Sequence, residues 1–226
     1  MKLYLCLGHY PVTFLSMRIV VVEDQRLFRQ LIVKMCSERF QVVGEAETGT
    51  DALRICREQE PDLLLMDIQI PKPDGITVAE TLLEELPSLR VLALSAKLDS
   101  VTVFRLLKSG VHGFVSKFSD QLDTVMIAVE AIYNGEPYFS DAFDQVKAEI
   151  KKDPLAYYKI LSNKELELLP LFSKGLDDST VSGMINLSAK TVRWHRRNIM
   201  KKLEIHASTD LMRYGITHGF WDPNPS

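Results

Sequence analysis

Five residues with chemically active side chains follow short apolar runs in the first part of the chain. They are Glu23, Asp24, Asp67, Ser95 and Lys117. If the runs are parallel strands, these residues meet at the carboxyl edge of one sheet, where open α/β folds place their ligand sites. Three carboxylates in one crevice repel one another unless a cation joins them. A ligand set made only of oxygens favours a hard ion such as Mg²⁺.

This combination of side chains predicts phosphoryl transfer to an aspartate. The cation would keep Asp67 ionised, so that its free oxygen can act as a nucleophile toward a phosphoryl group. Lys117 and Ser95 would then stabilise the added phosphoryl oxygens by charge and by hydrogen bonding.

A second candidate surface lies on a helix expected to run from Ser188 to about Leu203. At about 100° per residue, one arc of roughly 100° holds four cations, one indole and no acid. These five residues are Lys190, Arg193, Trp194, Arg197 and Lys201. Arginine recognises guanine edges, and an apolar side chain can meet a thymine methyl group. A helix of about 16 residues, some 24 Å long, can enter the major groove, so this face predicts DNA binding.

The opposite face of the same helix is expected to pack on its own domain. It carries Val192, His195, Ile199 and Leu203. Because His195 falls on this apolar arc, we interpret it as a packed histidine rather than as a residue that contacts bases.

The elements that position the first group form an alternating pattern. Runs that are almost continuous in Val, Leu and Ile are typical of strands covered on both faces. They occupy residues 18–22, 41–43, 62–66, 90–94 and 112–115. Apolar residues at helical spacing follow each run, and the first such set is Leu27, Phe28, Leu31, Ile32 and Met35. The pattern predicts a doubly wound five-stranded parallel sheet with a helix after each strand.

The last part of the chain predicts a small all-α domain. Ser162 and Glu165 have the spacing of a capping box, and Gly175 suits the position after a helix end. Asp178 or Ser179 can cap a second helix, Ser188 a third, and a fourth covers about 208–218.

Composition and charge restrict the class of protein. The chain has 226 residues, of which 46% are hydrophobic and 25% charged, so it is globular and has one or two domains. No apolar stretch is long enough for a membrane span. The spacing of Cys6, Cys36 and Cys56 fits neither a disulfide framework nor a zinc site, which favours a reducing cytosol. Residues 18–139 hold 13 Lys and Arg against 19 Asp and Glu, whereas 155–220 hold 10 against 6, which suggests a polyanionic partner for the second part.

About 120 residues resemble the receiver domain of bacterial two-component response regulators, a flavodoxin-like fold. The matching motifs are Val-Glu-Asp, Met-Asp-Ile-Gln-Ile-Pro-Lys-Pro-Asp-Gly, Leu-Ser-Ala and Gly-Phe-Val-Ser-Lys. The resemblance implies that Asp67 accepts phosphate from a sensor histidine kinase. It also implies that Glu23, Asp24, Asp67 and the main-chain carbonyl of Gln69 hold Mg²⁺, and that Lys117 binds the phosphoryl group. Ser95 and Phe114 match the two switch residues of the family, the hydroxyl that moves toward the phosphoryl group and the aromatic that turns inward.

The C-terminal part resembles the LuxR-type helix-turn-helix of the NarL/FixJ response regulators. The match runs from Leu161-Ser162-x-x-Glu165 through Gly175-Leu176 to the segment 187–203. The resemblance implies base contacts from Arg193, Trp194 and Arg197. It implies phosphate contacts from Lys190, Thr191 and Lys201, with Arg196 and Lys202 as further candidates. One departure is Gly183, which weakens or bends the preceding helix.

The boundaries predicted from these patterns are an N-terminal extension at 1–17, a receiver at 18–139, a linker at 140–158 and a DNA-binding domain at 159–221. In the linker, Ala142, Phe143, Val146 and Ile150 indicate a short helix that ends near Asp153-Pro154.

Together these features predict a cytoplasmic transcription factor switched by phosphate on Asp67. Phosphorylation would release or dimerise the DNA-binding domain, and the homodimer would bind paired half-sites of a double-stranded operator. RNA polymerase is a further candidate partner. One alternative is a DNA-binding factor whose receiver is a dimerisation module independent of phosphorylation. Another is an aspartyl-phosphate phosphatase acting on small molecules, but the shallow crevice and the absence of a cap region argue against an enzyme.

Overall fold

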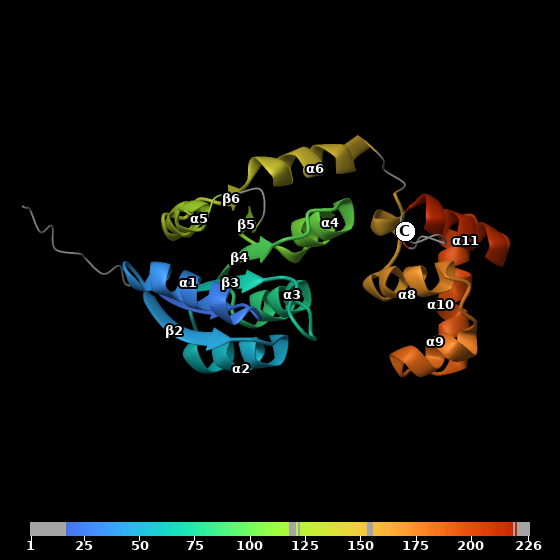
Figure 1. The fold of residues 1–226 in the computed structure, drawn as a ribbon, viewed down its shortest axis with the longest axis horizontal. Coiled ribbons are helices and arrows are strands. Elements are labelled where there is room, and N and C mark those ends of the chain that lie inside the picture. The colour runs from blue at the N-terminus through green and yellow to red at the C-terminus, as the bar shows by residue number, and fades with distance from the viewer. Residues whose placement is uncertain (1–16, 118–120, 122, 153–155, 219, 221–226) are drawn as a thin grey trace, which may run out of the picture. The chain divides into compact units, whose positions relative to one another are not determined.

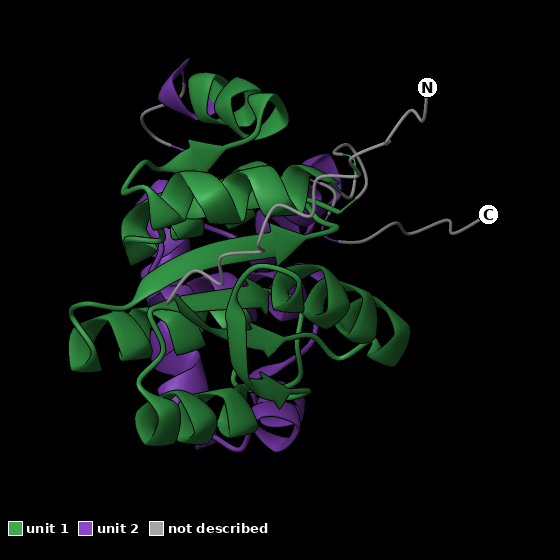
Figure 2. Ribbon diagram, turned by 90° about the vertical axis from the view of Figure 1, so that its left-hand side faces the viewer, with its two compact units in different colours: residues 1–149 green, residues 150–226 purple. Residues whose placement is uncertain are grey.

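The computed structural model describes residues 17–117, 121, 123–152, 156–218 and 220. They form two compact units that divide between Glu149 and Ile150, coloured green and purple in Figure 2. Of the predicted segments, the extension up to residue 16 and the Asp153-Pro154 joint lie outside the described residues.

The first unit is built on a parallel sheet, as predicted, but with six strands rather than five. Their order is β2-β1-β3-β4-β5-β6, and every neighbouring pair is parallel (Figure 1). The strands are β1 (Arg18–Val22), β2 (Gln41–Ala46), β3 (Leu63–Asp67), β4 (Arg90–Ser95), β5 (Gly113–Ser116) and β6 (Tyr138–Phe139).

The sixth strand corrects the five-stranded prediction. β6 contains only Tyr138 and Phe139, which pair with Gly113 and Phe114 of β5. Two residues after a proline carry no hydrophobic period that could be recognised in the sequence. The strand extends the sheet by one edge immediately before the predicted linker.

Helices cover both faces of the sheet. They are α1 (Arg26–Ser37), α2 (Gly49–Gln59), α3 (Gly75–Glu85), α4 (Ser100–Ser109) and α5 (Asp123–Tyr133). α1 and α5 share one buried core with alternate residues of the strands, including Ile19, Leu65 and Leu94. The strand residues between them face the other way, toward α2, α3 and α4, which pack beside one another. Both faces of the sheet are therefore shielded from solvent by helices, which explains why the strands are almost continuously apolar.

Helix α1 does not bury all of its predicted apolar residues. Ile32 is fully buried, whereas Leu27 is 83% exposed and Leu31 is 40% exposed. The helix instead buries Arg29, a charged residue that the sequence pattern did not single out. The buried stripe of α1 therefore runs through Arg29, Ile32 and Cys36, and Leu27 lies outside it.

The second unit is helical, as predicted. After α6 (Asp141–Lys152), which begins in the first unit, it contains α7 (Tyr157–Ile160), α8 (Asn163–Ser173), α9 (Asp178–Ile185), α10 (Ala189–Lys202) and α11 (Ser208–Thr217). α6 ends just before the predicted break. Leu168, Phe172, Val181, Val192 and Leu211 belong to its core.

Local signals set the ends of these helices. Ser162 and Glu165 form the predicted capping box, and Gly175 takes a left-handed φ of 78° after α8. The cap of α9 is one residue earlier than predicted, because Asp177 accepts the Thr180 N–H at 2.8 Å. Asp178 is therefore the first helical residue, and its carboxylate is free to contact α10.

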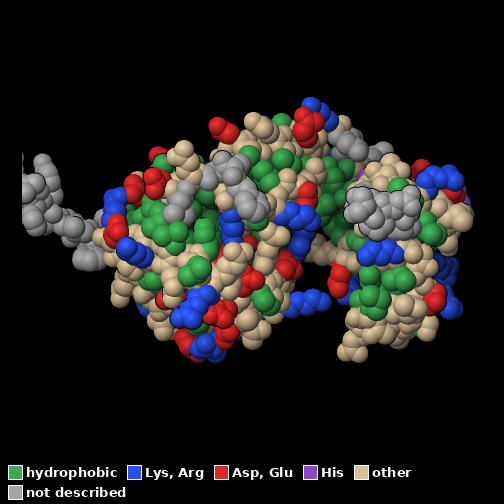
Figure 3. Space-filling view, in the orientation of Figure 1, with side chains coloured by type: hydrophobic (Ala, Val, Ile, Leu, Met, Phe, Trp, Pro, Cys, Tyr) green, Lys and Arg blue, Asp and Glu red, His purple; other side chains and the backbone are tan. Residues whose placement is uncertain are grey.

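None of the described helices has the length and apolar character that a membrane span requires. On the face shown in Figure 3, acidic and basic side chains are interspersed over the α/β unit. Exposed ion pairs in this unit include Arg57–Glu85, at 2.7 Å.

Candidate functional site

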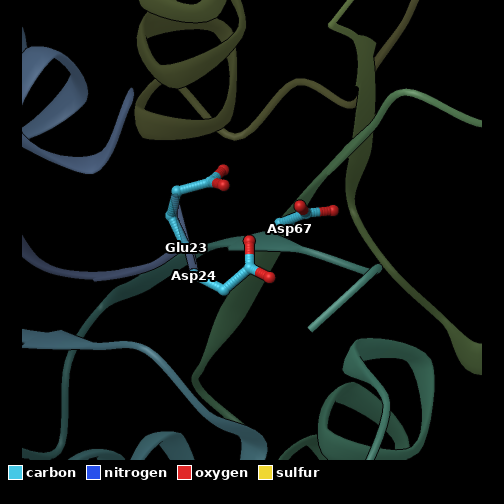
Figure 4. Close-up of side chains that lie close together, drawn as sticks. All are labelled: Glu23, Asp24 and Asp67. Carbon is cyan, nitrogen blue, oxygen red and sulfur yellow. The ribbon is translucent and has the colours of Figure 1, made fainter. Parts of the chain in front are cut away.

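Three carboxylates converge at the carboxyl edge of the sheet. Glu23 and Asp24 follow β1, and Asp67 ends β3, the strand beside it. One oxygen from each side chain lies within 4.8 Å of the others, and Figure 4 shows the three side chains close together. Glu23 and Asp67 are buried, whereas Asp24 is exposed. Three hard oxygen ligands at this spacing suit a divalent cation such as Mg²⁺, with water completing its coordination.

Lys117 reaches into the same cluster from the end of β5. Its ammonium nitrogen lies 2.5 Å from Glu23 Oε2 and 2.6 Å from Asp67 Oδ2, and its side chain is 9% exposed. The ammonium also lies 4.8 Å from the centre of the Phe28 ring. Burial raises the pKa of Glu23, and the neighbouring ammonium opposes that rise. The lysine thus compensates the charge of two buried carboxylates.

Asp67 is held on both sides. Oδ2 pairs with Lys117, and Oδ1 accepts the main-chain N–H of Gln69 at 2.8 Å. The Gln69 side chain is exposed. The turn after Asp67 therefore folds back on its carboxylate, which brings the peptide of Gln69 close to the cluster.

Ser95 ends β4 next to Asp67, but its hydroxyl is engaged elsewhere. Its Oγ donates to the main-chain carbonyl of Lys97 and accepts the N–H of the same residue, both at 2.9 Å. These two bonds tie the hydroxyl to the loop before α4. For Ser95 to contact a phosphoryl group, the loop must release it.

Phe114 lies on β5, beside Ala93 of β4. Its ring is fully buried and is 5.1 Å from the ring of Phe143 on α6, which in turn is 4.8 Å from Phe139. The aromatic predicted to be a switch residue thus packs directly on the helix that follows the sheet.

Helix α10 carries the second candidate surface. Ser188 caps it by accepting the Thr191 N–H at 3.1 Å, and Val192 and Ile199 are fully buried. On the outer side Trp194 is 59% exposed, and the cationic residues are also exposed. These are Lys190, Arg193, Arg197 and Lys201. Trp194, Arg197, Lys201, Ile205 and His206 are among the residues that line a shallow groove.

Thr191 and His195 lie at the borders of this face. The Thr191 hydroxyl lies 2.8 Å from the Ser188 hydroxyl, within the cap. His195 is half-buried, and the structure gives its buried Nδ1 no hydrogen-bond partner among the described residues. This inward position agrees with a packed histidine.

Arg196 makes several contacts inside the helical unit. Its guanidinium donates to Asp178 at 2.7 Å and to the Leu176 carbonyl at 2.5 Å, and it lies 4.1 Å from the centre of the Phe172 ring. These contacts fix α9 against α10 and give Arg196 a structural role, and the implied phosphate contact stays a prediction. The acid that determines this is Asp178, which the sequence pattern assigned as a candidate helix cap, whereas Asp177 is the cap.

Lys202 also has a partner inside the unit. Its ammonium lies 2.6 Å from Glu165 Oε2, and that carboxylate also accepts the Ser162 N–H at 2.7 Å. The pair links the start of α8 to the end of α10. The Lys202 side chain is 40% exposed, so this structural pairing leaves the implied phosphate contact a prediction.

Comparisons with known proteins agree with the two units. The family model for the response regulator receiver domain matches residues 19–129, and that for the bacterial regulatory proteins of the luxR family matches residues 159–215. The response regulator protein VraR of Staphylococcus epidermidis is 30% identical over 207 residues, which are 90% of this chain and 98% of that protein. The transcription regulator of virulence factors BvgA of Bordetella pertussis is 33% identical over 198 residues, which are 86% and 94% of the two chains.

Solved structures show the same fold. RcsB of Salmonella enterica serovar Typhimurium, bound to promoter rprA in the presence of the phosphomimetic BeF3⁻, has a TM-score of 0.62 at 23% identity. That match covers 88% of this chain and 98% of RcsB. A LuxR-family response regulator from Aurantimonas has a TM-score of 0.56 at 28% identity and covers 62% of this chain and all of its own.

The chain belongs to the two-component response regulators of the NarL/FixJ type, which join a receiver domain to a LuxR-type DNA-binding domain. It is a DNA-binding transcription regulator and not an enzyme.

Proposed function

We propose that this regulator is switched by phosphorylation of Asp67, with a sensor histidine kinase as the donor. The observation that carries the proposal is the position of Lys117, whose ammonium bridges Asp67 and Glu23 in a crevice that also holds Asp24. The domains are those of the sequence prediction: receiver 18–139, linker 140–158 and DNA-binding domain 159–221. The family models at 19–129 and 159–215 support these ranges.

The chemistry follows from the side chains of the cluster. A carboxylate oxygen of Asp67 forms a bond to phosphorus while the phosphorus–nitrogen bond of the kinase phosphohistidine breaks, and the departing imidazole takes up a proton. The Lys117 ammonium would then stabilise the negative charge on the phosphoryl oxygens. Glu23, Asp24, Asp67 and the Gln69 carbonyl would hold Mg²⁺, which neutralises charge between the acceptor and the donor phosphate.

Ser95 and Phe114 would transmit the change. The Ser95 hydroxyl would exchange its two bonds to Lys97 for a bond to a phosphoryl oxygen, which frees the loop before α4. Because Phe114 packs on Phe143, a change near the switch residues reaches α6, the helix between the two family-matched regions. The regulator would then dimerise and act in the cytoplasm on operator DNA and RNA polymerase.

In the DNA complex, α10 would occupy the major groove. Arg193, Trp194 and Arg197 would contact bases, and Lys190, Thr191 and Lys201 would contact phosphates. Arg193 donates its Nε to Asp178 at 3.1 Å, and its side chain is 69% exposed. Its remaining guanidinium donors therefore stay accessible to a guanine edge while Asp178 fixes its direction.

A selection from random DNA, made with and without acetyl phosphate and Mg²⁺, tests the proposal. We expect the donor to increase affinity for the selected operator in the wild type and to leave Asp67→Asn unchanged. Equal affinity of the wild type with and without the donor would refute the switch and favour a receiver that dimerises without phosphate.

A further inference from the structure

Arg29 on α1 is a buried arginine beside the acidic turn. Within the described part of the chain it is the only arginine classed as buried, with a side-chain exposure of 9%. It lies six residues after Glu23, on the inner side of the helix that follows the turn. Burial of a guanidinium costs free energy unless its charge is paired and its N–H groups are hydrogen-bonded. The partners of Arg29 therefore indicate what it does.

The guanidinium joins three segments. Nη1 donates to the main-chain carbonyl of Glu23 at 2.6 Å, and Nη2 donates to Glu47 Oε1 at 2.5 Å. Nε lies 3.4 Å from Glu45 Oε2. Glu45 is in β2 and Glu47 follows it, so Arg29 connects α1, the end of β1 and the end of β2.

The contact with the Glu23 carbonyl is the important one. That carbonyl belongs to the peptide joining Glu23 to Asp24, so holding it sets the direction in which both carboxylates leave the main chain. The position of Asp24 depends more on this hydrogen bond than that of Glu23 does, because the Asp24 side chain is exposed. Gln25, the residue before α1, makes no side-chain capping hydrogen bond, so a helix cap does not fix the turn that carries the two acids.

The effect of Arg29 is geometric rather than electrostatic. Two carboxylates, Glu45 and Glu47, compensate its single charge. The planar fork of donors fixes a carbonyl and two acids at once, which an ammonium cannot reproduce.

We infer that Arg29 is a positioning residue for a divalent cation at Glu23, Asp24 and Asp67. It acts through the peptide between the two acids and does not touch the cation. The inference rests on the proposed phosphoacceptor site. Partners of metal ligands typically change metal affinity about tenfold to a hundredfold when they are removed.

Binding of Mn²⁺ to the full-length protein, followed by the electron paramagnetic resonance signal of the free ion, tests the inference. We expect Arg29→Met to raise the dissociation constant about tenfold to a hundredfold, and Arg29→Lys to restore it only in part. The matched control is Arg90→Met: Arg90 is half-buried and also donates to main-chain carbonyls, those of Ile132 and Tyr133, but at the opposite edge of the sheet.

Melting without metal shows whether Arg29→Met is folded. If it is not, Glu47→Ala removes the outer anchor of Arg29 at an exposed position, and we expect a smaller rise in the dissociation constant. Unchanged Mn²⁺ affinity in the folded Arg29 variants, or in Glu47→Ala, would overturn the inference, as would an equal loss in Arg90→Met. Wild-type protein that binds no Mn²⁺ would overturn the proposed cation site itself.

Discussion

Lys117→Met tests the electrostatics of the phosphoacceptor crevice. The ammonium lies 2.5 Å from Glu23 and 2.6 Å from Asp67, and both acids are buried. Methionine keeps the apolar stem and removes the charge, which leaves two buried carboxylates without their common partner. Removing one member of a buried ion pair costs about 3–5 kcal/mol. We expect a loss of this size in the free energy of unfolding at neutral pH without divalent cations.

The loss should depend on pH in a definite direction. Burial raises the pKa of Glu23 in the folded protein, Lys117 opposes this, and the ordinary value is 4.5. Without Lys117 the folded-state pKa rises further, so the folded variant keeps a proton that the unfolded chain releases. The contribution of Glu23 to the stability of the variant is then greatest below pH 4.5. It falls by about 1.4 kcal/mol per pH unit from there up to the raised pKa.

Urea unfolding between about pH 5 and about pH 8 measures this dependence. Far-UV circular dichroism reports the whole chain, whereas fluorescence reports only the DNA-binding part, because Trp194 and Trp221 are the two tryptophans. Lys97→Met is the matched control, since Lys97 is 61% exposed and pairs with Asp99. A Lys117→Met protein as stable as the wild type at neutral pH, or a loss independent of pH, would refute the reasoning.

Three further predictions concern the DNA-binding unit. Arg197→Ala should weaken specific operator binding by about 1–3 kcal/mol in a fluorescence anisotropy titration. The control is Arg213→Ala on α11, whose side chain is 79% exposed and which should leave the affinity unchanged. Equal effects of the two substitutions would contradict a base contact from Arg197. Gly183→Ala should stabilise the unit by up to about 1 kcal/mol, because an added Cβ meets nothing within 4 Å; a lower melting temperature would show that the glycine has another role. Burial alone would raise the pKa of Glu165, but hydrogen bonds from Lys202 and Ser162 lower it overall. The ionised acid therefore stabilises the unit above pH 4.5, and this contribution is lost on acidification. Glu165→Gln should therefore make the free energy of unfolding, followed by tryptophan fluorescence, fall less steeply toward acid pH. A steeper fall would contradict this prediction.

Much of the fold could be predicted because its signals are local. Continuous apolar runs predicted the parallel sheet, and strand ends in a parallel sheet share one edge. For the same reason Glu23, Asp67 and Lys117 could be grouped before their distances were known. The Ser162 and Gly175 helix signals likewise depend only on nearby residues.

The features that were missed depend on tertiary contacts. β6 has only two residues and is defined by its pairing with β5. The role of Arg29 required β2 to lie beside β1, and that of Arg196 required the acid of α9 to face α10. The direction of the Ser95 hydroxyl is set by its hydrogen bonds to Lys97, two residues away. The alternative directions of the hydroxyl differ only by a rotation of the serine side chain. A charge inside an apolar stripe, as at Arg29, is the one signal that could have been recognised in the sequence.

Chemical mapping of the phosphoryl group tests the central claim most directly. The full-length protein is incubated with acetyl phosphate and Mg²⁺, reduced with borohydride to convert an aspartyl phosphate to homoserine, and digested for peptide sequencing by mass spectrometry. We expect homoserine at position 67 in the wild type and at no position in Asp67→Asn. Modification at Asp24 or another residue, or none in wild-type protein that binds Mg²⁺, would contradict the assignment of Asp67 as the phosphoacceptor.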